Sequence, residues 1–187
     1  MWGRVYEQKI NRNWQTTVAA YHYNAERLIE IHEDPNDGLL VFRNIGDVKT
    51  DGLDLVLNGR LDSGLATRLS YSYARGRDRA TDTVLTNSPE NMAKLTFTAP
   101  MLNRQLHAGL SVRYLSSRLT YDRELIESHT ITDLTTKAKI PGTGLELTAG
   151  VYNIFDEHYE LPVGDEHLQN KIAGDGRLGR VGAKYSF

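Results

Sequence analysis

The chain has 187 residues, of which 40% are hydrophobic and 25% charged, and its formal net charge is −2. No run of about 18 apolar residues occurs, which excludes a helical membrane protein, and the charge gives no electrostatic reason to expect a nucleic-acid partner. Cysteine is absent, so disulfides and thiolate chemistry are excluded too.

Apolar and polar residues alternate with a period of two along most of the chain, which predicts half-buried β-strands. Helix formers at residues 25–28 also allow a helical turn, but hairpin topology favours one long strand from Tyr23 to Glu33. About nine strands are expected, from residues 3–10 to residues 179–187. The alternation is clear over residues 65–73, 93–101, 106–114, 133–140, 145–151 and 179–187, and it also runs over residues 53–58, where Val56 interrupts the polar face.

The connections between these strands alternate in length. Short turns are expected at residues 11–13, 62–64, 103–105 and 142–144, and long polar connections near 33–38, 76–91, 120–129 and 159–176. This pattern predicts an all-β, antiparallel up-and-down meander that is part of a transmembrane β-barrel, with tight turns at one rim and loops at the other. An odd strand count indicates a fragment or one misassigned strand, because single-chain bacterial barrels usually have an even number.

Strands of about ten residues, long loops on one side only and the aromatic positions favour a membrane barrel over a soluble β-sandwich, whose strands are commonly about 5–6 residues long. An outer aromatic girdle is expected from Tyr71, Tyr73, Tyr114 and Tyr152, and an inner one from Trp14, Tyr185 and Phe187, although tyrosine also favours strands in general. Charged residues expected to face the lumen are Arg68, Lys94, Arg113, Lys137, Lys139, Glu146, Arg180 and Lys184.

Three motifs with possible chemistry have plainer explanations. Residues 174–179 match G-x-G-x-x-G, but that motif needs a following helix, and the last eight residues alternate as a strand. The mixed-charge tip with Arg75, Arg77, Asp78, Arg79 and Asp82 could bind lipopolysaccharide phosphates or another anion, but a solubilising loop is favoured. The acidic, histidine-containing run of Asp156, Glu157, His158, Glu160, Asp165, Glu166 and His167 fits no tight metal site. No catalytic constellation is found, so we expect neither an enzyme nor a cofactor.

The sequence resembles the C-terminal part of TonB-dependent receptor barrels along nearly its whole length. The most specific pieces are residues 150–159, with an Asn-x-Phe-Asp pattern before a tyrosine, and the final Tyr-Ser-Phe. Residues 44–48 and 52–55 are similar to the family's Asn-x-Gly and Gly-x-Glu-x segment, with Asp54 where glutamate is commoner. Residues 87–93 are similar to its return into the next strand.

This resemblance implies a barrel of about 22 strands plugged by an N-terminal domain, which imports iron–siderophore complexes, cobalamin or similar nutrients across the bacterial outer membrane. Residues 1–187 would be its C-terminal portion, without the plug and the first strands. The implied partners are outer-membrane lipid and lipopolysaccharide, the barrel-assembly machinery and, only through the missing plug, TonB. Tyr185 and Phe187 resemble the signal that the assembly machinery reads.

Two other functions stay open from the sequence. One is a passive porin-like or structural outer-membrane barrel, and the other is a soluble all-β binding protein. For a barrel fragment, the strands at residues 3–10 and 179–187 would be unpaired edges, which leave backbone groups unsatisfied in lipid. We therefore expect that the chain does not fold stably alone.

Overall fold

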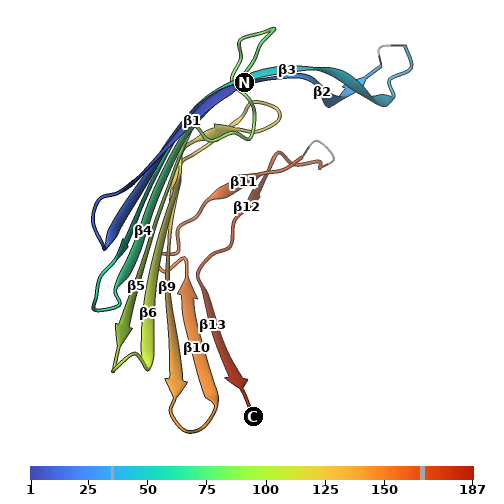
Figure 1. Ribbon diagram of the computed structural model, residues 1–187. Helices are drawn as coiled ribbons and strands as arrows, with labels where there is room; N and C mark the ends of the chain where they lie inside the picture. The colour runs from blue at the N-terminus through green and yellow to red at the C-terminus, as the bar shows by residue number, and fades with distance from the viewer. Residues whose placement is uncertain (35, 165–166) are drawn as a thin grey trace.

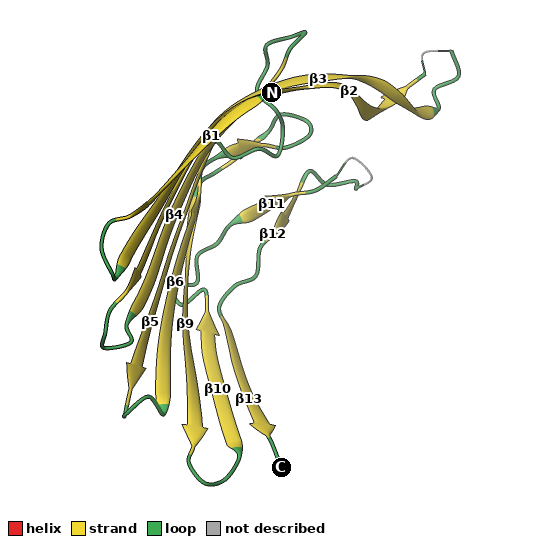
Figure 2. Ribbon diagram, in the orientation of Figure 1, coloured by secondary structure: helices red, strands yellow, loops and turns green. Residues whose placement is uncertain are grey.

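A computed structural model of the protein describes residues 1–34, 36–164 and 167–187. The described residues form strands, turns and loops and contain no helix (Figure 2). Within this part of the chain, no helix has the length and hydropathy that a membrane crossing requires.

The main element is a nine-stranded sheet in the order β1-β2-β3-β4-β5-β6-β9-β10-β13, with every neighbouring pair antiparallel. The predicted meander of about nine strands is therefore confirmed, although the barrel is not closed. The strands are β1 (Trp2–Lys9), β2 (Trp14–Glu33), β3 (Leu40–Arg60), β4 (Ala66–Asp78), β5 (Asn91–Met101), β6 (Leu106–Leu115), β9 (His129–Ile140), β10 (Leu145–Tyr152) and β13 (Leu178–Tyr185).

Two small hairpins lie within the long connections. β7 (Arg118–Leu119) pairs with β8 (Leu125–Ile126), and β11 (Glu160–Pro162) pairs with β12 (Lys171–Ala173). The sequence did not predict them, because strands of two or three residues are too short to show an alternating pattern. Figure 1 shows a strongly curved sheet with the β11–β12 hairpin on its concave side.

The register separates the sheet into an apolar face and a polar face. Leu57, Leu69, Leu95 and Val112 are successive partners in one row of the apolar face. Leu69 is 44% exposed and Leu95 37% exposed, so no layer of the described residues covers these two leucines. The next row, on the polar face, consists of Asn58, Arg68, Thr96, Ser111 and Asp133.

The expected long strand through Tyr23–Glu33 is present, and the helix formers lie in a bulge. The register between β2 and β3 shifts between Ala25 and Leu28. Arg27 has a φ of 57°, and its backbone N–H donates to Asp47 Oδ1 at 3.0 Å. A bulge satisfies that N–H and bends the strand, so a helical turn is not needed.

Gly52, in the family-like segment, is required by the close approach of an aromatic ring. A Cβ at this position would collide with the ring of Tyr21 on the polar face. Gly59 has the same relation to Trp14 on the apolar face, where a Cβ would lie 2.5 Å from the ring. Each glycine allows a large ring to lie flat across the neighbouring strand.

The sheet ends in two open edges. In the described residues β1 pairs with β2 alone, and β13 pairs with β10 alone. The predicted edges at residues 3–10 and 179–187 are thus where the sheet stops. Each edge carries a row of backbone groups that another strand could pair with.

Candidate functional site

Three long connections at one rim of the sheet, residues 79–90, 116–128 and 153–177, contact one another, and we call them the loop layer. Asn87 N donates to Leu119 O at 2.7 Å, and Ser116 N donates to Asn91 O at 2.9 Å. Asn91 N in turn donates to Ser116 Oγ at 3.0 Å. These bonds fix the second connection against the first connection and against the start of β5.

The second connection also contacts its neighbours through charged side chains. Arg123 Nη2 donates to Thr83 Oγ1 at 3.0 Å. Lys171 Nζ lies 3.8 Å from Glu124 and 3.2 Å from Glu160. The three connections are therefore linked by side chains as well as by backbone bonds.

Asn153, the first residue of the family-like Asn-x-Phe-Asp pattern, braces the third connection. It is 3% exposed, and its φ of 50° ends the preceding strand. Its Nδ2 donates to Glu157 O at 2.9 Å and Asp175 O at 3.1 Å, and its Oδ1 accepts from Glu157 N at 2.8 Å. Asp156 Oδ1 accepts from Arg177 N at 2.8 Å, so the pattern fixes both ends of the connection.

The loop layer covers the polar face near the start of β9. Asn153 N donates to Asp133 Oδ1 at 3.0 Å. The rings of His129 and Tyr159 stack with their centroids 4.6 Å apart. Ile126 is completely buried and Ile131 is 6% exposed, so the layer has a small core of its own.

Arg118 is a buried cation within this layer. It is 6% exposed, and among the described residues its guanidinium makes no hydrogen bond and no ion pair; its Nη1 is buried and has no partner. Burial lowers the pKa of the Arg118 guanidinium, which nevertheless stays protonated, as arginine does in proteins. The buried His129 Nδ1 also lacks a partner.

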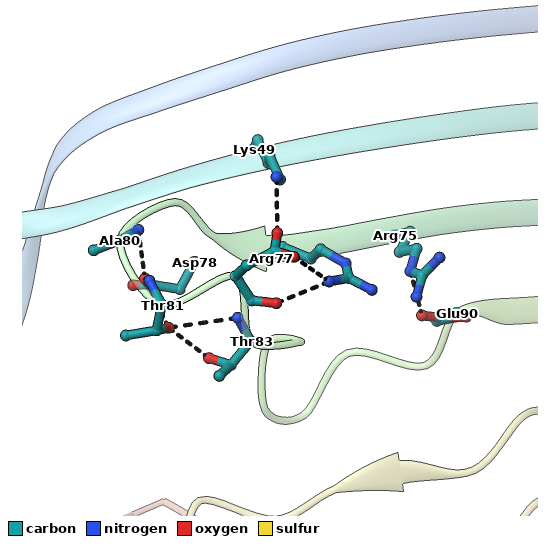
Figure 3. Close-up of polar contacts among 9 residues, drawn as sticks. Lys49, Arg75, Arg77, Asp78, Ala80, Thr81, Thr83 and Glu90 are labelled. Carbon is teal, nitrogen blue, oxygen red and sulfur yellow. Dashed lines mark hydrogen bonds and ion pairs between the residues drawn. The ribbon is translucent and has the colours of Figure 1, made fainter.

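The charged side chains of the mixed-charge tip form ion pairs with one another and with neighbouring strands (Figure 3). Asp82 receives two cations, Arg77 and Lys49, each at 2.8 Å. These two cations hold the pKa of the exposed Asp82 carboxyl below its ordinary value. Arg79 pairs with Glu26 at 3.1 Å. The solubilising interpretation fits this better than an anion site, because each cation already has a partner.

All eight charged residues predicted to face the lumen lie on the polar face, as their partners across the strands place them there. Arg113 pairs with Asp133 at 3.0 Å and Lys137 with Glu146 at 2.7 Å. The same face has a hollow of about 600 Å³ that includes His107, Lys137 and Arg180 in its lining. The polar face therefore carries more cations than its acids neutralise.

One predicted girdle residue is on the wrong face. Tyr71, Tyr73 and Tyr114 lie on the apolar face. Tyr152 lies on the polar face, in phase with Gly150, and Arg180 Cζ lies 5.6 Å from the centre of its ring. Its distance from the preceding turn predicted its height in the sheet correctly, but the alternation in β10 sets the face.

The other predicted candidates lie as follows. Residues 174–179 lead directly into β13, so the strand expected after the glycine-rich motif is confirmed. In the described part of the acidic run no group of three or more acidic or histidine residues could hold a metal, while Asp165 and Glu166 lie outside the described residues. Tyr185 ends β13, and Phe187 follows it fully exposed; their role as an assembly signal stays a prediction.

Comparison with known proteins identifies a family. Residues 6–154 match the family model described as TonB dependent receptor-like, beta-barrel. No curated protein matches the sequence.

Similar solved structures cover nearly the whole chain. The ferric-catecholate import receptor Fiu from E. coli K12 has a TM-score of 0.74 at 16% identity, with 99% of this chain and 27% of that chain covered. FpvA from P. aeruginosa, bound to a ferric pyoverdine, has a TM-score of 0.76 at 18% identity, with 99% of this chain and 27% of that chain covered. The ferric yersiniabactin uptake receptor FyuA from Yersinia pestis has a TM-score of 0.76 at 14% identity, with 99% of this chain and 30% of that chain covered. At these identities the likeness shows the fold, and this chain spans less than a third of each structure.

Proposed function

Because the chain belongs to the TonB-dependent receptor β-barrel family, we propose that it forms part of the barrel wall of an outer-membrane importer for a scarce nutrient, such as an iron–siderophore complex. The observation that carries this proposal is the division of the sheet into two faces. On one face, side chains that can contact lipid form a row of Leu57, Leu69, Leu95 and Val112. The neighbouring row on the other face includes Arg68 and Asp133, which are typical of a water-filled barrel interior.

Residues 1–187 then form the C-terminal portion of a larger barrel, and a plug and further strands would come from elsewhere in the complete receptor. The solved relatives support this arrangement, because this chain covers 27% to 30% of three of them. In this proposal TonB acts through the plug, and the barrel-assembly machinery reads the C-terminal strand with Tyr185 and Phe187. The apolar face would contact outer-membrane lipid, and the loop-layer rim would meet lipopolysaccharide.

The iron-chelate proposal follows from the functions of the similar solved structures. Fiu and FyuA are named as receptors for ferric catecholate and ferric yersiniabactin, and another structure of this fold is a copper transporter, OprC, with a TM-score of 0.74. Iron chelates are therefore the first substrates to test, with copper as the alternative cargo.

The test is nutrient uptake by cells that carry or lack the gene. We expect the gene to increase uptake of at least one radiolabelled iron chelate under iron limitation, and expect a protonophore or loss of TonB to abolish the increase. Uptake that persists without TonB would replace this proposal with a passive pore. A protein recovered in soluble form without detergent would contradict both.

A further inference from the structure

The Arg118 guanidinium is a charge without a counter-ion in the described part of the chain. The residue as a whole is 6% exposed. Burying a charged group without a partner costs several kcal/mol, so the folded loop layer is expected to supply an anion or to admit one.

The acids that lie in or beside the cavity are already engaged. Glu90 lines the same cavity as Arg118, but its Oε1 lies 3.3 Å from Arg75 Nε, and Figure 3 shows the carboxylate turned toward that arginine. Glu124, in the same connection, lies 3.8 Å from Lys171. Neither acid forms an ion pair with Arg118.

The cavity beside Arg118 is large enough for a ligand. It has a volume of about 240 Å³ and lies between connections 79–90 and 116–128, whereas one water takes up about 30 Å³. Asn91 also lines it. The lining also includes the hydroxyl-bearing residues Ser88, Ser116 and Ser117.

We propose that Arg118 and this cavity form an oxyanion-binding site, whose ligand is a phosphate or carboxylate group. An arginine fork matches the two oxygens of such a group. The oxyanion could be a free ion or the acid group of a larger solute, and the chemistry of the site is the same for both. The site lies in the loop layer, so it does not depend on which nutrient the barrel carries or on the transport proposal.

The test is a calorimetric titration of the protein, produced from its own gene and extracted from membranes in detergent. The probes are inorganic phosphate and citrate. We expect saturable binding with one site per chain. Phosphate alone binding would indicate a free ion, and citrate binding more tightly would indicate the acid group of a larger solute; either result supports the site.

The variants separate this site from general charge effects. Arg118→Gln should weaken binding at least about tenfold, the loss expected for one charged hydrogen-bonding group. Arg118→Lys should retain part of the affinity, and it provides a second variant if the glutamine fails to fold by circular dichroism. Arg177→Gln removes the same charge elsewhere in the loop layer and should bind like the wild type.

Two results would overturn the proposal. The first is a folded wild-type protein without saturable binding at millimolar phosphate or citrate, which would leave water as the occupant. The second is an equal loss of affinity in Arg118→Gln and Arg177→Gln, which would indicate diffuse attraction by the loop layer.

Discussion

At the scale of single residues, Asn153 shows how one side chain organises a long connection. Its amide group contacts backbone atoms of Glu157 and Asp175, which lie on opposite arms of the 153–177 connection. The sequence marked this asparagine through its family-like pattern. It could not predict the contact with Asp175, because that bond joins residues 22 positions apart.

We predict that Asn153→Ala destabilises the protein by about 1–3 kcal/mol, because it leaves buried backbone groups without partners. The measurement is the free energy of unfolding in denaturant, together with amide hydrogen exchange at Glu157. Gln169→Ala is the control, since Gln169 is exposed in the same connection. Unchanged exchange at Glu157 in the Asn153 variant would show that the brace is dispensable.

The Asp82 carboxyl gives a pH-dependent prediction. Lys49 and Arg77 lower its pKa below the ordinary value of 3.8. Because the pKa in the folded chain is lowered, the contacts stabilise the tip above about pH 3.8 and are lost as the pH falls through the lowered value. Asp82 is 62% exposed at its side chain, so solvent screening keeps the effect small.

We expect Lys49→Gln to raise the pKa of Asp82 toward 3.8, as followed by the carboxyl carbon shift in an NMR titration. Arg12→Gln, at the opposite rim and paired with Asp62, should leave the titration unchanged. An identical titration curve in the Lys49 variant would mean that the ion pair does not form in solution.

Two buried residues of the loop layer, Arg118 and His129, were not predicted to matter. His129 is in phase with Ile131 and Asp133 along β9, so the alternation could have placed it on the polar face. Arg118 carries no such signal, because its burial depends on two other connections folding over it. Its environment exists only in the assembled loop layer.

At the scale of strands, alternation predicted the two faces well because the period of a strand is fixed at two residues. The same rule shows why Tyr152 was assigned wrongly. Counting residues from a turn gives the position along the strand. The face depends on whether a residue is an odd or an even number of positions from Val151, which lies on the apolar face, and Tyr152 is one position away. The hairpins β7–β8 and β11–β12 were missed because their pairing is set by loop packing.

Neighbouring residues of β6 provide a matched test of the two faces. Leu110 pairs with Phe97 and Leu134 on the apolar face, and Ser111 pairs with Thr96 and Asp133 on the polar face. Leu110→Arg should cost about 2–4 kcal/mol in lipid, as arginine does near the middle of a bilayer. Ser111→Arg should change the stability by about 0.5 kcal/mol or less.

The measurement for this pair is reversible unfolding, in guanidinium chloride from lipid vesicles, of the longer receptor that contains this chain, because both edges of the sheet are then paired. Equal costs for the two substitutions would contradict the assignment of the apolar face to lipid. A larger cost for Ser111→Arg would reverse the faces, and with them the interior that the transport proposal needs.

At the scale of the whole molecule, the curved sheet has a polar concave side but no closing contact. A sheet in lipid must close, because open edges leave backbone N–H and C=O groups without partners. In the proposed larger barrel, strands β1 and β13 would pair with strands from outside residues 1–187. The sequence predicted the edges from the strand count, but it gave no means to determine what pairs with them.

We predict that the 187-residue chain produced alone in detergent self-associates through β1 and β13. Light scattering after size exclusion should give a mass that rises with protein concentration, and the chain should lack a compact band in unheated gel samples. The same chain within a longer receptor should give one mass and a heat-sensitive compact band, because both edges are then paired. A compact monomer of the isolated chain would show that the edges close on each other, and the proposal of a larger barrel would then fail.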